Sequence, residues 1–150
     1  MDVNIPATNV EQAVTFESID FDIGSSELKP EMENNLHLII DFLVNRPQFN
    51  CKITGHTDTT GDPAINKKLS QERAENIRNY LLSYGGLDSS RVQAVGMGSA
   101  DPIVKDEYSE KDRKLNRRVE FHMYLSEKFR KKAEHGEPEE GKKDREKFEK

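Results

Sequence analysis

The sequence of 150 residues has no tryptophan and a single cysteine, Cys51. One cysteine cannot form an internal disulfide, so a disulfide-stabilised scaffold is excluded. Because Cys51 lies in a short apolar stretch, we expect a buried thiol rather than a reactive one. Cys51 also does not stand where a lipoprotein anchor would, so we expect any lipid attachment to lie outside this sequence.

Long apolar runs are missing as well, and none could span a bilayer. The first residues, Met1-Asp2-Val3-Asn4, lack the basic and apolar regions of a signal peptide. We therefore expect either a cytoplasmic protein or a piece of an exported one. The net charge of -5 argues against nucleic acid as a partner, because phosphate binding needs a clustered basic surface.

The composition, 33% hydrophobic and 34% charged, is typical of a chain that is solvated in part. We predict a linker over residues 1–12, one domain over 13–125 and a charged, largely disordered tail over 126–150. The tail contains nine basic and eight acidic residues and no apolar stripe. A short helical extension followed by disorder is the simplest interpretation of it, and an interaction tail is the alternative.

Apolar periodicity predicts the elements of the domain. Two strand pieces, or one strand with a bulge, are expected between Ala13 and Ile23, where the alternation changes phase. A helix should begin near Pro30 and end before Pro47, because apolar residues recur at helical spacing. They are Met32, Leu36, Ile39, Ile40 and Leu43.

A short buried strand around Cys51 and Ile53 should lead into a Gly-flanked loop and then a second helix. That helix should have Asp62 as N-cap and Pro63 at its first position, and should end at Gly85-Gly86. A brief strand is predicted over 91–96, a loop over 96–102 and an exposed connection over 106–114. The final strand, 117–125, alternates cleanly, with Val119, Phe121, Met123 and Leu125 facing the core.

The second helix contains a conflict. Its apolar residues form one broad stripe, and they are Ile65, Leu69, Ala74, Ile77, Tyr80, Leu81 and Tyr84. Arg73 falls near the centre of that stripe, with Asn66 and Ser70 on the same line. A guanidinium that is turned inward is costly unless an anion accepts its donors, and the nearest candidate is Asp58 in the loop before the helix.

Two interpretations of Asp58 and Arg73 remain open on this pattern: a structural ion pair, or a ligand site. The surrounding chemistry favours a ligand. Thr57, Thr59 and Thr60 offer hydroxyl and backbone N–H groups, and the helix N-terminus adds partial positive charge. One carboxylate and one guanidinium across a cleft suit a zwitterion, so the ligand class is an amino-acid-like group.

Several motifs of the sequence stand out together: Gly55-His56-Thr57-Asp58, Gly61, Asn66, Leu69-Ser70, Arg73-Ala74 and Asn116-Arg117-Arg118-Val119-Glu120. In order and spacing they resemble the OmpA-like peptidoglycan-binding domain, which also occurs in peptidoglycan-associated lipoproteins and flagellar stator proteins. The resemblance covers roughly Val14 to Tyr124. It implies that Asp58 and Arg73 bind the diaminopimelate of the peptidoglycan stem peptide.

With these elements, the resemblance implies an α/β (α+β) fold of order β-α-β-α-β-β, with a small mixed sheet and helices packed against it. It also implies a periplasmic domain associated with the outer membrane of a Gram-negative bacterium, with peptidoglycan as partner. The polar wall of the site would be completed by Asn66, Thr60 and Arg117, and Asp22 would lie at its rim. Arg117 shares the phase of the core-facing row, whereas Arg118 is expected to face solvent or pair across the sheet.

Other functions are weaker on the sequence. The pair His56-x-Asp58 could belong to a metal-binding module, but a third ligand at a known spacing is missing. A cell-wall hydrolase would need a nucleophile with a base, or paired carboxylates. The glycines Gly96 and Gly98 lack the third glycine of a nucleotide fingerprint. We expect neither an enzyme nor a cofactor.

Overall fold

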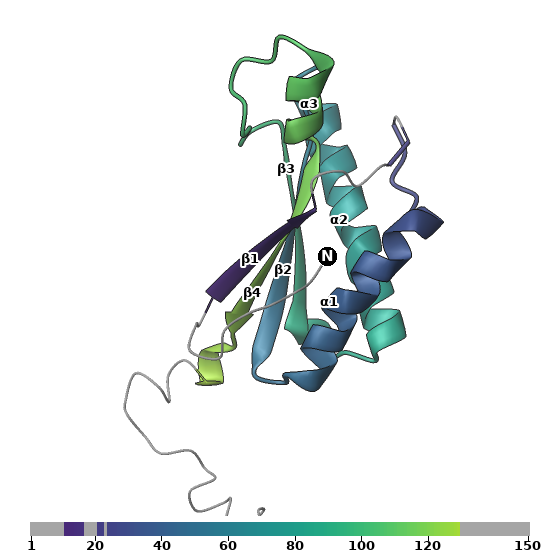
Figure 1. Cartoon of the computed structure of the whole chain (residues 1–150), viewed down its shortest axis with the longest axis vertical. Helices are drawn as coiled ribbons and strands as arrows, with labels where there is room; N and C mark the ends of the chain where they lie inside the picture. Colours follow the sequence, from purple (N-terminus) through teal and green to yellow (C-terminus); the bar gives the residue numbers. More distant parts are fainter. Residues whose placement is uncertain (1–10, 17–20, 23, 130–150) are drawn as a thin grey trace, which may run out of the picture.

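The computed structural model describes residues 11–16, 21–22 and 24–129, and of 11–16 the backbone only. Strands and helices alternate along this part of the chain (Figure 1). The elements are β1 (Glu11–Phe16), α1 (Glu33–Asn45), β2 (Phe49–His56), α2 (Pro63–Gly85), β3 (Val92–Gly98), α3 (Glu110–Asn116) and β4 (Arg118–Leu125). Short 3-10 turns, Pro30–Met32 and Ser89–Arg91, precede α1 and β3.

The four strands form one mixed sheet in the order β1-β4-β2-β3. Strands β2 and β3 are parallel, and β4 is antiparallel to both of its neighbours, β1 and β2. The expected α/β class with a small mixed sheet is therefore confirmed. The short helix α3 was not expected, because the sequence predicted only an exposed connection there.

Helices α1 and α2 lie on the same side of the sheet and enclose the core against it (Figure 1). All five apolar residues predicted for the face of α1 are buried. Val119, Phe121 and Met123 of β4 meet them, as the alternation predicts, whereas Leu125 is only partly buried. Cys51 is fully buried, as expected, and burial raises the pKa of its thiol to about 12.

The ends of the domain differ in detail from the prediction. Strand β1 starts at Glu11, two residues before the expected domain start, and Phe21 lies outside any strand. The predicted second strand piece falls largely on residues outside the described part, as do most of the linker and the tail. Asp62 has N-cap backbone geometry, but its side chain makes no capping hydrogen bond.

The predicted apolar stripe of α2 is wrong at both ends, where Ile65 is 64% exposed and Tyr84 is 65% exposed. Two residues that were assigned to the polar side are half-buried against the sheet. Gln71 donates to the carbonyl of Ala94 at 3.1 Å, and Arg78 donates from Nε to the carbonyl of Val92 at 2.7 Å. Because β3 is an edge strand, its outward backbone groups need polar partners, and α2 supplies them.

Strand β3 also runs further than predicted, through Gly98, where a loop was expected from Gly96. The glycines allow the backbone of α2 to lie directly on the strands. A Cβ at Gly96 would lie 2.2 Å from the backbone nitrogen of Gln71, and a Cβ at Gly55 would lie 2.7 Å from the carbonyl oxygen of Ser70. Both strands therefore need glycine where α2 crosses them.

We predict that Gly96→Ala lowers the free energy of unfolding by about 1–3 kcal/mol, the usual cost of overpacking a well-packed contact. Replacement of glycine by alanine otherwise stabilises a protein through the unfolded chain, so a loss isolates the steric effect. Urea unfolding measures it. The control is Gln93→Ala on the exposed side of the same strand. An unchanged unfolding midpoint for Gly96→Ala would contradict the close packing.

Candidate binding site

A cleft of about 430 Å³ opens where the end of β2, the first half of α2 and the start of β4 meet. Of the predicted site residues, Asp58, Asn66, Arg73 and Arg117 line it. His56, Glu110, Lys114 and Arg118 line it as well. The strand β2 delivers the loop that carries Asp58 at its carboxyl end, the usual position of ligand sites beside parallel strands.

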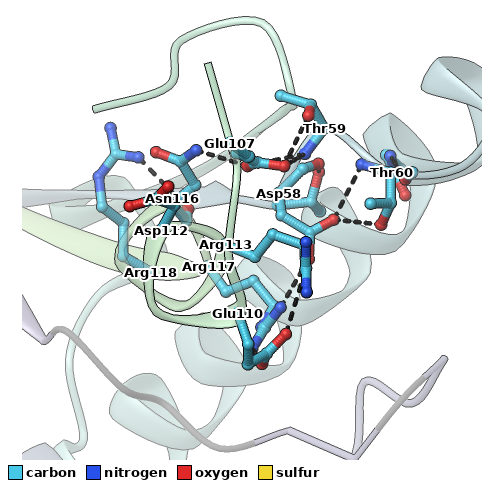
Figure 2. A network of polar contacts seen from close by, with 12 residues as sticks. Asp58, Thr59, Thr60, Glu107, Glu110, Asp112, Arg113, Asn116, Arg117 and Arg118 are labelled. Atoms are coloured by element: carbon cyan, nitrogen blue, oxygen red, sulfur yellow. Dashed lines mark hydrogen bonds and ion pairs between the residues drawn. The ribbon is translucent and has the colours of Figure 1, made fainter. Parts of the chain in front are cut away.

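Asp58 is held by hydrogen bonds to both of its carboxylate oxygens. Oδ1 accepts from the backbone N–H of Thr60 at 3.0 Å and from the Thr60 hydroxyl, and Oδ2 accepts from Nη1 of Arg117 at 2.6 Å (Figure 2). Burial by itself raises the pKa of Asp58, but the hydrogen bonds from Thr60 and Arg117 outweigh it, so the pKa lies below its ordinary value. The carboxylate is therefore charged at neutral pH.

Arg117 bridges two carboxylates. Its Nη2 donates to Glu110 of α3 while its Nη1 holds Asp58, as Figure 2 shows. Burial lowers the pKa of Arg117, but Asp58 and Glu110 raise it by more than burial lowers it, so the pKa is raised overall. Both Arg117 and Arg118 line the cleft, and both anions that Arg117 contacts belong to the protein.

Arg118 is buried rather than solvent-exposed, which corrects the expectation for this side chain. It is 4% exposed, and its Nε donates to Glu120 at 2.8 Å. Nη2 donates to the carbonyl of Asp101 at 3.0 Å. A guanidinium can be buried here because a carboxylate and carbonyl groups accept its donors.

Arg73 is oriented by carbonyl groups instead of a carboxylate. Its Nε donates to the carbonyl of Ser25 at 2.8 Å, its Nη2 donates to the carbonyl of Asp22 at 3.2 Å, and its guanidinium lies 4.7 Å from the ring centre of Phe21. Burial first and Arg117 second lower the pKa of Arg73, while Asp58 opposes the shift. Across the described residues there is no ion pair between Asp58 and Arg73. They therefore do not form the structural ion pair that was one of the two interpretations of the sequence.

Two predicted site residues do not line the cleft but contact residues that do. Asp22 offers its backbone carbonyl to Arg73, but its side chain is exposed and pairs with Lys29 at 3.1 Å. Thr60 supports the Asp58 carboxylate and is not among the lining residues. Asn66 does line the cleft, and its amide donates to the carbonyl of Thr60 at 2.8 Å.

The segment between β3 and β4 contributes more than the sequence indicated. Glu107 accepts from the backbone N–H of Thr59 at 3.1 Å and from its hydroxyl at 2.6 Å (Figure 2). The buried side chain of Asn116 accepts from the backbone of Ile103 and Val104 and donates to Glu107. This network ties the segment to the loop of Asp58. Only Asn116, within the Asn-Arg-Arg motif, could have been suspected from the sequence.

His56 lines the cleft but is buried, with 4% of the residue exposed. Neither ring nitrogen has a hydrogen-bond partner, and Nε2 lies 3.5 Å from Oε1 of Glu120. Burial and the adjacent Arg118 lower the pKa of His56, and the opposing effects of Glu120 and Asp101 do not cancel that shift. The imidazole is therefore neutral at pH 7.

The chemistry of the alternative functions finds little support in this geometry. Within the described ranges, no group of three or more His, Cys, Asp and Glu side chains could hold a metal ion. The hydroxyl of Ser70 donates to the carbonyl of Lys67 at 2.9 Å and accepts from the N–H of Gly98 at 2.8 Å, so both hydrogen bonds of this hydroxyl hold α2 and β3 in place.

No helix in the described part is long and apolar enough to cross a membrane.

The fold and the cleft define a small α/β domain with a cleft lined by opposite charges. The sequence model of the OmpA family matches residues 20–117, and the chain belongs to that family.

Known relatives agree with this assignment. The chain is 38% identical to outer membrane porin F of Pseudomonas fluorescens over 74% of its own length, which is about a third (34%) of that protein. Among solved structures, the cell wall anchor of the T6SS from Pseudomonas aeruginosa superposes with a TM-score of 0.66 at 28% identity, covering 77% of this chain and 82% of that one. The peptidoglycan-associated lipoprotein from Burkholderia pseudomallei gives 0.62 at 30% identity, covering 74% and 88%.

We predict that His56 makes the domain less stable as the pH falls below about 6.5, its ordinary pKa. In this range the unfolded chain protonates His56 near its ordinary pKa of 6.5, whereas the folded protein takes up the proton only at a lower pH, so protons favour unfolding. The lowered pKa values of Asp58 and Glu120 place their contributions at lower pH. Urea unfolding at several pH values measures the slope.

The variant His56→Gln cannot take up this proton, so its free energy of unfolding should depend less on pH in the same range. The control His37→Gln changes an exposed histidine of α1 and should keep the wild-type contribution, because His56 is still present. Equal slopes for wild type and His56→Gln would show that the buried imidazole is not the titrating group.

Proposed function

We propose that this domain binds the stem peptide of peptidoglycan non-covalently through its diaminopimelate residue. In this role it anchors an outer-membrane or envelope protein to the cell wall. The observation that carries the proposal is that Asp58 and Arg73 line the same cleft from different elements and are not paired with each other. A carboxylate and a guanidinium kept apart in one cleft suit the ammonium and carboxylate at the end of a diaminopimelate side chain.

Asp58 has room for the ammonium. A carboxylate offers about four lone-pair sites, and Thr60 and Arg117 occupy three of them. The remaining site lies on Oδ2, beside the cleft. The lowered pKa of Asp58 keeps the carboxylate charged, as an ammonium ligand requires.

Arg73 has donors for the carboxylate. A guanidinium carries five N–H donors, and the carbonyls of Ser25 and Asp22 take two of them. These carbonyls and the ring of Phe21 fix the orientation of the side chain without neutralising its charge. A ligand carboxylate therefore meets a guanidinium that is already positioned, which lowers the entropic cost of binding.

The other predicted residues have graded roles in this proposal. Asn66 and Arg117 contribute polar groups to the wall of the cleft, with Arg117 holding Asp58 in place. Thr60 acts through Asp58, and Asp22 acts through its backbone carbonyl on Arg73. None of these roles requires a catalytic step, so we propose a binding domain rather than an enzyme.

The relatives support the same function. One solved relative is a cell wall anchor, and another is a peptidoglycan-associated lipoprotein. Porin F is an outer membrane protein, and this chain matches only its minor part. We propose by analogy a periplasmic location at the outer membrane of a Gram-negative bacterium, with the rest of the parent protein holding the domain there.

We predict that calorimetric titration detects binding of meso-diaminopimelate but not of Nα-acetyl-lysine amide, whose side chain ends in an ammonium group without a carboxylate. Asp58→Ala or Arg73→Ala should weaken binding by about 2–5 kcal/mol, because each change leaves the opposite charge of the ligand buried and unpaired. For a small, weakly bound ligand this loss of binding free energy leaves no detectable heat of binding. Co-sedimentation with purified sacculi provides the same comparison for the intact cell wall.

The chain offers a matched control for each variant. Asp62→Ala removes an exposed carboxylate from the same loop, and Lys68→Ala removes an exposed cation from the same helix. Both controls should bind like the wild type. Binding to sacculi that survives both Asp58→Ala and Arg73→Ala would refute the proposal, and release of soluble fragments from the sacculi would indicate a hydrolase.

A further inference from the structure

The charges that line the cleft do not balance. Four basic side chains and two carboxylates line it, and they are Arg73, Lys114, Arg117, Arg118, Asp58 and Glu110. Arg118 is neutralised from behind by Glu120, through a hydrogen bond of 2.8 Å. The charges that a ligand meets are therefore three cations and two carboxylates.

Arg117 and its partner Glu110 form an ion pair, which removes one cation and one carboxylate from this set. Arg117 holds Asp58 with one nitrogen and Glu110 with another, so it can remain paired with Glu110 while Asp58 receives a ligand ammonium. The ligand ammonium then neutralises Asp58. After this exchange, the cleft retains two cations without a carboxylate partner.

These two cations are Arg73 and Lys114. Across the part of the chain that the structure describes, neither forms an ion pair with a carboxylate. Arg73 extends from α2, whereas Lys114 is an exposed residue of α3, so the two approach the cleft from different elements. One ligand carboxylate satisfies Arg73 in the proposed function, and Lys114 is left without an anion.

We propose that Lys114 binds a second carboxylate of the ligand, so that the cleft recognises a peptide group with one ammonium and two carboxylates. This inference rests on the proposed function and names a further specificity-determining residue of the same site. In a stem peptide, the residue before diaminopimelate is a D-glutamate linked through its γ-carboxyl group, which leaves its α-carboxylate free. That carboxylate supplies the second negative charge, and its amidation removes it.

The test uses two acetylated tripeptides, L-alanyl-γ-D-glutamyl-meso-diaminopimelate and its isoglutamine analogue. Both carry an amide on the α-carboxyl group of diaminopimelate, so they differ at a single carboxylate. Calorimetric titration compares the wild type, Lys114→Gln and Lys111→Gln. Lys111 is an exposed lysine of the same helix that does not line the cleft, which makes it the matched control.

We expect amidation to weaken binding to the wild type by about two- to fivefold, the range for an exposed ion pair. Lys114→Gln should bind the acidic peptide more weakly by the same factor and should not distinguish the two peptides. Lys111→Gln should behave like the wild type. The difference between the peptides should shrink as salt is added, because the pair is exposed.

The outcomes separate this inference from the function on which it rests. Equal binding of both peptides to the wild type, or full affinity in Lys114→Gln, overturns the role of Lys114 and leaves the diaminopimelate site standing. Amidation that weakens Lys114→Gln as much as the wild type also overturns that role, since another residue then senses the carboxylate. Binding of neither peptide overturns both proposals.

Discussion

The direct backbone contact between α2 and the parallel strands is the constraint on which the rest of the structure depends. Gly55 and Gly96 leave no Cβ between strand and helix, so α2 crosses the strands at backbone distance. The first half of the helix therefore lies beside the loop that follows β2. Asn66 and Arg73 reach the cleft from the helix, and Asp58 reaches it from the loop. A helix held away from the sheet by side chains would separate these groups.

The electrostatics of the cleft follow from how each charge is held. Asp58 is held by Thr60 and Arg117, whereas Arg73 is held by carbonyl groups, which orient a guanidinium without neutralising it. A buried charge without a counter-ion is normally costly, and a carboxylate partner is the usual remedy. Here the carbonyls and the ring of Phe21 compensate in part, so the guanidinium remains available to an anion. In the function that we propose, this arrangement is preorganised for the ligand carboxylate.

Much of the fold could be predicted from the sequence, because apolar periodicity records burial directly. The face of α1 and the alternation of β4 were predicted correctly for this reason. Helix α2 was predicted less well. Ile65 and Tyr84 at its ends are exposed. Gln71 and Arg78, assigned to the polar side, are half-buried against the edge of β3 by hydrogen bonds that hydropathy cannot register. The same edge explains why β3 extends through Gly98: glycines that resemble a loop in the sequence are required by the packing of α2.

The residues of the candidate site also differ in whether the sequence could predict them. Arg73 could be singled out from the sequence because a cation on an apolar stripe needs a partner. This argument does not depend on which group accepts its N–H donors. The partner of Asp58 could not be found in that way, since Arg117 lies 59 residues further along the chain and only the fold brings it close. Glu107 and Glu110 were invisible within a charged connection, where every side chain looks solvated. A surface charge acquires a role through its neighbours in space, so the segment that sequence reasoning set aside as exposed supplies one wall of the cleft.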